Sequence, residues 1–422
     1  MRSAERRNHL GATFRAHQTS AALEYRTEYH RDRDRIVWSK SFKRLQHKTQ
    51  IFPHYFEDHY RRRLTHSLEV AQIATTVARA LGLNEVATEA MALGHDLGHT
   101  PFGHAGEQAL NRVLQDECRK YGIDPAKHSV PVMGFDHCVH AIEVVSRIER
   151  EYEHETGQGG LNLTFDVRDG ILKHMFERPG RPERPLSSLS NVTKISGYEA
   201  YANNKGSLEA QSVYFADKIA YFFGDIEDGL RSNILPCQEL MTDEFFQVLV
   251  EKYAEYRGHQ EDLRISKVAQ FPLFRSRTLT VMILDCIDST RANLHNHSFG
   301  GVDDVLECND RLVWVGDQLG KAADEFYHKW MNDYMFKHEN VVACGFKAQK
   351  IVTDLFNVCC DDVDLINRPY REHCQRAYAD VCDPKSDLFR LILARNYVAG
   401  MTDSFAIQWH ARLFMSSEHI SI

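Results

Sequence analysis

Hydrophobic and polar positions follow a helical period along most of this chain. From Ser67 to Leu81 apolar residues recur along one helix face, and Gly82 is suited to end that helix. Asn84 is suited to cap a second helix that runs to about residue 93. The same period predicts helices at residues 105–121, 136–155, 210–230, 245–256, 279–290, 310–330, 346–356 and 387–414. Strand-like alternation is nearly absent, so the predicted fold class is all-α.

Several segments interrupt this pattern. Residues 1–22 are polar and basic, which predicts a flexible arm, and order is expected to begin near residues 29–38. A glycine-rich break at residues 157–160 is followed by a predicted loop at 161–164, and residues 178–185 combine three prolines with three arginines. We expect a helical core at residues 23–235 and a C-terminal helical region at residues 236–422 packed on it.

Composition narrows the class of protein. A chain of 422 residues with 43% hydrophobic content can bury a large core. The net charge of −8 argues against nonspecific nucleic-acid binding, so an anionic substrate would need a local cluster of cations. No apolar run is long enough for a membrane span, and the N-terminus lacks the apolar stretch of a secretory signal. The ten cysteines form no CxxC pair, which favours reduced thiols in the cytoplasm.

Chemistry concentrates in residues 94–107, within a chain that has 23 histidines. His95 and Asp96 adjoin a predicted helix end, and Gly98 and Pro101 are suited to terminate that helix. Both side chains can therefore reach one cation. Further ligands would come from His66, at the start of a helix suited to pack antiparallel, and from Asp217. Two imidazoles and two carboxylates suit a divalent ion such as Mn²⁺, Mg²⁺ or another transition metal.

A His-Asp dipeptide alone occurs by chance in most chains of this length, but here it stands in a wider set of motifs. Residues 24–235 resemble the HD superfamily, and within it the bacterial deoxyguanosine-triphosphate triphosphohydrolase family. The segments that carry this resemblance are residues 31–36, 42–52, 65–69, 94–107, 160–164, 217–229 and 397–406.

The resemblance implies His66, His95, Asp96 and Asp217 as metal ligands. It also implies a helical homo-oligomer, a tetramer or a hexamer, that cleaves a deoxynucleoside triphosphate to the deoxynucleoside and inorganic triphosphate, with dGTP favoured. Positioning and charge neutralisation would dominate such a reaction.

Three residues are candidates for catalysis. His104 and Glu107 share a helix face at i, i+3, so the carboxylate can orient the imidazole for proton transfer. These two positions are catalytic in similar enzymes, whether the histidine acts as acid or as nucleophile. Alternatively, Glu107 only favours the first turn of its helix. The segment 135–143 resembles one that presents another active-site histidine, here His137, although Cys138 and His140 replace the usual Asn and Gln.

Substrate contacts are expected along one face of a later helix. Asp217, Tyr221 and Asp225 lie at i, i+4 and i+8, so they point into one cleft. The resemblance implies a metal ligand, a ring under the deoxyribose and an acceptor for the 3′-hydroxyl; the alternative for Tyr221 is core packing. A triphosphate also needs cations. Further candidates for substrate contacts are Gln50, Arg63, His99, Lys173, Lys194 and Lys218.

The chain also contains two basic runs, residues 31–35 and 61–63, whose part in regulation stays open. Such runs are usually solvated faces, but they could contact an effector dNTP or single-stranded DNA, as in some relatives. Two other functions are consistent with the same residues. One is a different HD phosphohydrolase, such as a nucleotidase or phosphodiesterase, and the other is a nucleotide- or nucleic-acid-binding regulator without turnover.

Overall fold

The structure is a computed structural model that describes residues 25–49, 61–123, 134–153, 159–174, 205–257 and 271–415. Within these ranges it is built from helices, and the extended pairing is a single isolated bridge between Thr49 and Arg62. This confirms the predicted all-α class. None of the helices in the described ranges combines the length and apolarity needed to cross a bilayer. The predicted arm at residues 1–22 and the proline-rich segment at residues 178–185 lie outside the described residues.

The first half of the chain supplies most of the helices around the motif at residues 94–107. They are α1 Glu28–Trp38, α2 Lys40–Arg44, the 3-10 turn η2 Leu45–His47, α3 Arg63–Leu81, α4 Glu85–Gly94, α5 Gly103–Lys120, α6 His137–Glu143, the π turn η4 Val144–Ile148, α8 Phe165–Lys173 and α9 Leu208–Arg231.

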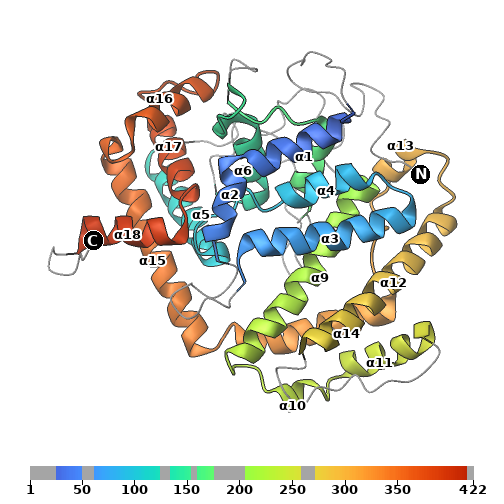
Figure 1. Ribbon diagram of the computed structural model, residues 1–422. Coiled ribbons are helices and arrows are strands. Elements are labelled where there is room, and N and C mark those ends of the chain that lie inside the picture. Colours follow the sequence, from blue (N-terminus) through green and yellow to red (C-terminus); the bar gives the residue numbers. More distant parts are fainter. Residues whose placement is uncertain are drawn as a thin grey trace.

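The second half adds a further set that wraps around the first (Figure 1). They are α10 Cys237–Leu240, α11 Glu244–Arg257, α12 Phe271–His297, α13 Val302–Glu307, α14 Asp317–Phe326, the π-helical η8 Tyr327–Met335, α15 Glu339–Asp361, the 3-10 turn η9 Val363–Leu365, α16 Arg368–Ala377, α17 Asp387–Ala399 and α18 Asp403–Phe414.

Local sequence explains the antiparallel hairpin of α3 and α4. Gly82 ends α3 in the left-handed region at φ 70°, which a residue without Cβ adopts easily. Asn84 then caps α4, because its side-chain oxygen accepts the backbone N–H of Ala87 at 3.0 Å. Helix α9 packs across both members of this hairpin, and α1 covers α4 (Figure 1). The predicted caps are therefore confirmed.

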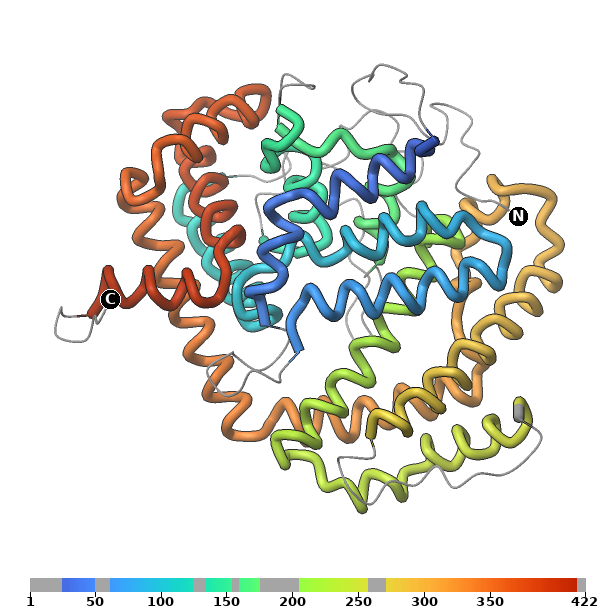
Figure 2. The backbone as a smooth tube through the Cα atoms, viewed as in Figure 1, coloured from blue at the N-terminus to red at the C-terminus, as the bar shows by residue number. Residues whose placement is uncertain are grey.

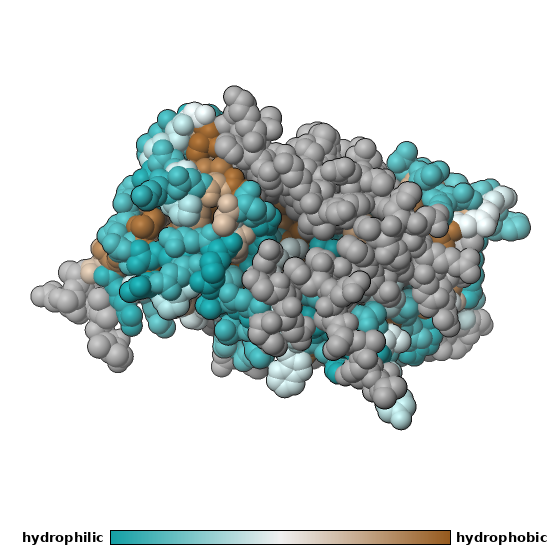
Figure 3. All heavy atoms as spheres, turned by 90° about the horizontal axis from the view of Figure 1, so that it is seen from above, coloured by the Kyte–Doolittle hydropathy of each residue, from teal (hydrophilic) through white to brown (hydrophobic). Residues whose placement is uncertain are grey.

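Two hydrophobic cores join the halves of the chain. The larger core contains side chains from α1 to η8, on both sides of residue 235, but none from α5. The smaller core packs α5 against α15 and α17, which lie beside it in space although far away in sequence, and α18 against α15 (Figure 2). The apolar helix faces thus point inward. The face in Figure 3 is mostly hydrophilic where described, with small apolar areas on the side of α15–α18.

Several predicted helices are wrong in extent. The helix expected at residues 310–330 begins only at Asp317, and those expected at 279–290 and 346–356 are parts of the longer α12 and α15. The helix expected at residues 136–155 ends as α6 and the π turn η4, because Glu149 turns extended and residues 160 and 161 donate backbone hydrogen bonds to the carbonyls of Glu149 and Val145. The helix expected at residues 387–414 is two helices, since Thr402 caps a new one by accepting the N–H of Phe405. A helix at α8, which the sequence reading did not predict, follows the loop 161–164.

Candidate active site

A cavity of about 460 Å³ lies between the two halves of the chain. Such a volume is in the range of small-molecule sites. The first half lines it with side chains from α3, the turn after α4, α5, α6 and α9, and the second half with side chains from α14, η8 and α15. The polar members of this wall include Arg63, His66, Asp96, His99, His104, Glu107, His137, His174, Asp217, Lys218, Tyr221, Asp324, Tyr327 and His328.

The four predicted metal ligands come together beside this cavity, and three of them, His66, Asp96 and Asp217, line it. His66 lies on α3, His95 and Asp96 follow directly on the last residue of α4, and Asp217 lies on α9. The Nε2 atom of His66 is 2.9 Å from Asp217 Oδ1. The Nε2 atom of His95 is 3.4 Å from Asp96 Oδ1 and 3.6 Å from Asp217 Oδ1. All four residues are buried.

This donor set fits a divalent cation. The ligand atoms of His66, His95 and Asp96 lie within 4.8 Å of one another. His95 Nε2 is buried and has no hydrogen-bond partner among the described residues, while its Nδ1 is held by the carbonyl of Ala92 at 2.6 Å. Burial would lower the pKa of His95, but Asp96 and Asp217 raise it to about 9. The potential at this nitrogen is therefore strongly negative, as a cation site requires.

The turn after α4 packs against α6 so closely that it needs a glycine. A Cβ at Gly98 would lie 1.9 Å from the carbonyl oxygen of His137 and 2.3 Å from the nitrogen of Ala141. The helix itself ends earlier, at Gly94, so the expectation that Gly98 and Pro101 terminate it is wrong. Gly98 instead allows the backbone that carries His95 and Asp96, the candidate ligand pair, to approach α6.

Asp96 is held from two sides. Arg63 Nη1 donates to Asp96 Oδ2 at 2.9 Å, and His99 Nε2 lies 3.1 Å from Asp96 Oδ1. The ring of His99 also stacks on that of His137, with 3.8 Å between the ring centroids. Arg63 and His99 therefore line the cavity, where the predicted substrate contacts could form, but the Arg63 guanidinium already pairs with the Asp96 carboxylate.

Glu107 links the two other candidate catalytic residues, His104 and His137. Its Oε2 atom is 3.2 Å from Nδ1 of His104, and its Oε1 atom is 3.1 Å from Nδ1 of His137. Burial alone would raise the pKa of Glu107, but the two imidazoles hold it well below its usual range. The His104 side chain is 40% exposed, whereas those of Glu107 and His137 are 5% and 1% exposed. His104 is thus the member that solvent and a substrate can reach.

The helix that carries His104 begins in an unusual way. Phe102 and Gly103 both adopt left-handed backbone conformations, with φ 62° and 56°. This conformation is unfavourable for phenylalanine, but its side chain is only 8% exposed and belongs to the smaller core. The turn therefore sets the direction of α5 and places His104 at the cavity.

The predicted stripe on α9 is only partly in the cavity wall. Asp217 and Tyr221 line the cavity, and the Tyr221 ring lies 6.4 Å from the His104 ring. Asp225 is buried behind them and accepts a hydrogen bond of 3.2 Å from the hydroxyl of Tyr327. Burial and then the charge of Asp228 raise the pKa of Asp225 well above its usual range. This buried position argues against the predicted direct contact between Asp225 and a sugar.

The predicted phosphate-binding residues are dispersed. Lys218 lines the cavity wall, with its Nζ 5.6 Å from the centroid of the Tyr214 ring. Lys173 is fully buried away from the cavity lining, and its Nζ lies 2.9 Å from Asp169 Oδ1. The structure does not bring it to the site. Gln50 and Lys194 lie outside the described residues.

Three further residues of the cavity wall, His174, Tyr327 and His328, are not predicted from the sequence. His174, the residue after α8, packs its ring edge against His95 with 4.9 Å between centroids. Tyr327 and His328 reach the cavity from η8, which begins 96 residues after Arg231, the last residue of α9. No local motif marks any of the three. Cys138, by contrast, directly follows the predicted His137 in the sequence, and this adjacency indicates that it lies near the site.

Comparisons with known proteins agree with this geometry. A family model described as HD domain matches residues 63–221, and one described as phosphohydrolase-associated domain matches residues 317–412. These segments contain, respectively, the four candidate ligands and the second-half part of the cavity wall.

Relatives that match over most of this chain point to the same kind of hydrolase. A deoxyguanosinetriphosphate triphosphohydrolase-like protein of Bordetella pertussis is 37% identical over 391 residues, covering 93% of this chain and 91% of the relative. Proteins of the same name from Ralstonia pickettii and Thiobacillus denitrificans are 37% and 35% identical, covering 92% and 96% of this chain and 88% and 95% of the relatives. The chain therefore belongs to the deoxyguanosinetriphosphate triphosphohydrolase-like family of HD-domain hydrolases.

Proposed function

We propose that this protein is a metal-dependent triphosphohydrolase that converts a deoxynucleoside triphosphate, with dGTP favoured, to the deoxynucleoside and inorganic triphosphate. The observation that carries this proposal is the convergence of His66, His95, Asp96 and Asp217 beside the His104–Glu107 pair at one cavity. The names of the relatives support the nucleotide substrate.

The metal site would be formed by the two imidazoles and two carboxylates. Mn²⁺, Mg²⁺ or another divalent transition metal bound there would act as a Lewis acid toward a phosphoryl oxygen and lower the pKa of a bound water. Arg63 and His99 position the Asp96 carboxylate for this task. Arg63 is thus proposed as a positioning residue for a metal ligand as well as a part of the cavity wall.

The reaction breaks the bond between the α-phosphorus and the 5′-oxygen of the sugar. Water supplies the oxygen that remains on the triphosphate, and the departing 5′-oxygen takes up a proton. His104, oriented by Glu107, is exposed to the cavity and is proposed to act in this step, either as the acid that protonates the 5′-oxygen or as the attacking nucleophile. His137 shares the same carboxylate and completes this group.

Substrate contacts follow from the cavity wall. Lys218 is proposed to contact the phosphates, and Tyr221 is proposed to lie against the deoxyribose, where its ring would disfavour a 2′-hydroxyl. Asp225 is proposed to act indirectly by holding Tyr327. Gln50 and Lys194 remain proposed contacts from outside the described residues.

The proposal also assigns a role to each of the two regions of the chain. We propose a phosphohydrolase core at residues 23–235 and a C-terminal region at residues 236–422 that completes the cavity with η8 and α15. A homo-oligomer, regulation by a dNTP or single-stranded DNA, and a cytoplasmic location complete the proposal. The ten free cysteines support the last of these.

Product analysis tests the proposal. Purified protein would be incubated with each of the four dNTPs, alone and in pairs, with Mn²⁺, Mg²⁺ or Co²⁺, and the products separated by liquid and ion chromatography. Deoxynucleoside and triphosphate in equal amounts are expected. Release of single phosphate or pyrophosphate would instead indicate another HD phosphohydrolase, and dNTP binding without turnover would indicate a regulator.

A further inference from the structure

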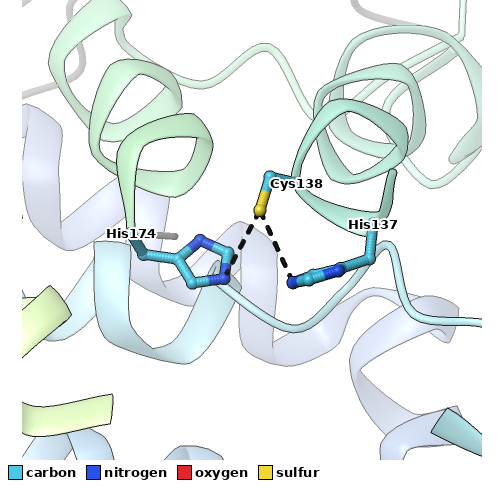
Figure 4. A group of neighbouring side chains, drawn as sticks. All are labelled: His137, Cys138 and His174. Atoms are coloured by element: carbon cyan, nitrogen blue, oxygen red, sulfur yellow. Dashed lines mark hydrogen bonds between the residues drawn. The ribbon is translucent and has the colours of Figure 1, made fainter. Parts of the chain in front are cut away.

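A second group of metal-type donors lies next to the four candidate ligands. It consists of His137 and Cys138 at the start of α6 and His174 after α8, and all three are buried. Figure 4 shows the two imidazoles facing the sulfur from opposite sides. Cys138 Sγ is 3.5 Å from Nε2 of His137 and 3.9 Å from Nε2 of His174.

The far nitrogens of both rings are fixed by acceptors. His137 Nδ1 lies 3.1 Å from the Glu107 carboxylate, and His174 Nδ1 lies 2.6 Å from the carbonyl oxygen of Ile171. Each acceptor needs a proton on Nδ1, so each neutral ring presents the lone pair of Nε2 to the sulfur. This is the arrangement in which metal-bound histidines are usually held by a carboxylate or carbonyl.

The Nε2 atoms of His137 and His174 compete for the single proton of the Cys138 thiol. A thiol has one proton, which can be donated to only one of the two Nε2 atoms at a time. The other buried nitrogen would then face a sulfur without a donor, which is unfavourable. A single cation bound to Cys138 as thiolate satisfies both nitrogens and the sulfur together.

The distances match such a cation. Zinc–sulfur bonds of about 2.3 Å and zinc–nitrogen bonds of about 2.0 Å, at a tetrahedral angle, separate sulfur from nitrogen by about 3.5 Å. The observed separation of 3.5 Å to His137 equals this value, and that of 3.9 Å to His174 is slightly longer. All three donor atoms lie within 4.8 Å of one another. The tetrahedron needs one further ligand, and His137 and His174 both line the cavity from which water could supply it.

We propose that His137, Cys138 and His174 form a second metal site that takes a thiophilic divalent cation such as Zn²⁺. The thiolate disfavours Mg²⁺ and Mn²⁺, which prefer oxygen ligands, so the two neighbouring sites differ in selectivity. The site adjoins the first one, since the His174 ring packs edge-on against the His95 ring. The proposal does not depend on which nucleotide the protein hydrolyses.

Cobalt titration of the full-length protein tests this site. Co²⁺ replaces Zn²⁺ in such sites, and a cobalt–thiolate bond absorbs in the near ultraviolet. The wild type is expected to develop this band and to saturate it with about one equivalent of Co²⁺ bound to sulfur. Cys138→Ser should abolish the band, and His174→Ala should weaken cobalt binding at least tenfold. Absence of the band in the wild type, or its survival in Cys138→Ser, would overturn the proposal.

Two control variants separate this site from others. His297, Cys308 and Asp310 form another donor group, at the surface, so Cys308→Ser must leave the band intact. Asp217→Ala removes a ligand of the first site and should abolish hydrolysis while the band persists. Loss of the band in Cys308→Ser would place the sulfur ligand elsewhere and refute the proposal.

A metal analysis covers the case in which Cys138→Ser does not fold. Wild type and His174→Gln would be loaded with Zn²⁺, freed of excess by gel filtration, and analysed by mass spectrometry for zinc per chain, with thermal melts to verify folding. The wild type should hold one more zinc than the variant. Equal zinc contents in two folded proteins would contradict the site.

Discussion

Asp403, at the start of α18, accepts the backbone N–H of Phe102 through its Oδ1 atom at 2.9 Å. Its other oxygen accepts the backbone N–H of Thr49 at 2.9 Å and also the Thr49 hydroxyl. The buried Asp403 carboxylate thus anchors two segments that are distant from it in sequence. One is the turn that precedes His104, and the other ends at Thr49.

Asp403→Ala is therefore expected to impair both stability and turnover. It leaves the Phe102 and Thr49 N–H groups buried without their acceptor, which destabilises by about 1–3 kcal/mol for each group. Turnover should fall because the His104 turn loses its anchor, while metal content stays the same. Thermal melts, kinetics and metal analysis measure these effects. Ser404→Ala, at an exposed neighbouring position, is the control; equal behaviour of the two variants would contradict this role.

His104→Ala should lose turnover without losing metal or stability. The imidazole is 40% exposed and is not among the four candidate ligands, so its removal affects the chemical step. A decrease in kcat of about 100-fold or more is expected for a group active in proton transfer or nucleophilic attack. His47→Ala, an exposed histidine away from the cavity, provides the comparison. A His104 variant with a near-normal rate would remove this residue from the mechanism.

Asp96→Ala and Asp217→Asn should both lose metal, but only the first should lose much stability. Removing Asp96 leaves the Arg63 guanidinium, 1% exposed, without its carboxylate, which costs about 3–5 kcal/mol. The double variant Arg63→Met with Asp96→Ala should recover most of that stability while metal binding stays lost. Denaturant unfolding and metal analysis measure the two effects separately. If the double variant were no more stable than Asp96→Ala, the ion pair would not explain the loss.

Glu149 should make stability decrease as the pH rises from about 4.5 to 7. Burial raises the pKa of this carboxyl from 4.5 to about 7, and the neighbouring Glu151 adds to the shift. The folded state thus binds the proton more tightly than the unfolded state, so the stabilisation is complete below pH 4.5 and is lost through pH 7.

Glu149→Gln mimics the protonated acid, and its amide oxygen can still accept the Ser41 N–H that lies 2.6 Å from the carboxylate. The variant should melt like the wild type at pH 5 and at a higher temperature than the wild type at pH 8. A constant difference in melting temperature across this range would exclude Glu149 as the cause.

The parts of this fold that local chemistry determines could be predicted. The caps at Gly82 and Asn84 depend on backbone conformation and on one side-chain hydrogen bond, and both follow from residue type. His66 and Asp217 could be paired with the His95–Asp96 dipeptide because the motifs occur in a known order. Their convergence at 2.9–3.6 Å then follows from the packing of α9 on the α3–α4 hairpin.

The remainder depends on contacts between distant segments, which residue type does not encode. Tyr327 reaches Asp225 because η8 packs on α9, and His174 reaches Cys138 because α8 packs on α6. Lys173 pairs with Asp169, one helical turn before it on α8, and this i, i+4 spacing is visible in the sequence. The helical turn η4 ends at Ile148 and helix α17 ends at Ala399. Both ends depend on hydrogen bonds made by the residues that follow, and the spacing of apolar residues does not reveal such bonds.

The left-handed turn at Phe102 and Gly103 has a consequence for how catalysis is prepared. A left-handed phenylalanine costs about 1–2 kcal/mol in backbone energy, but relaxing it would withdraw a phenyl ring from the smaller core, at a cost of about 3–5 kcal/mol. The turn is therefore locked in one conformation. His104 is thereby preorganised: its position is fixed during folding, and little reorganisation energy remains to be supplied when a substrate binds.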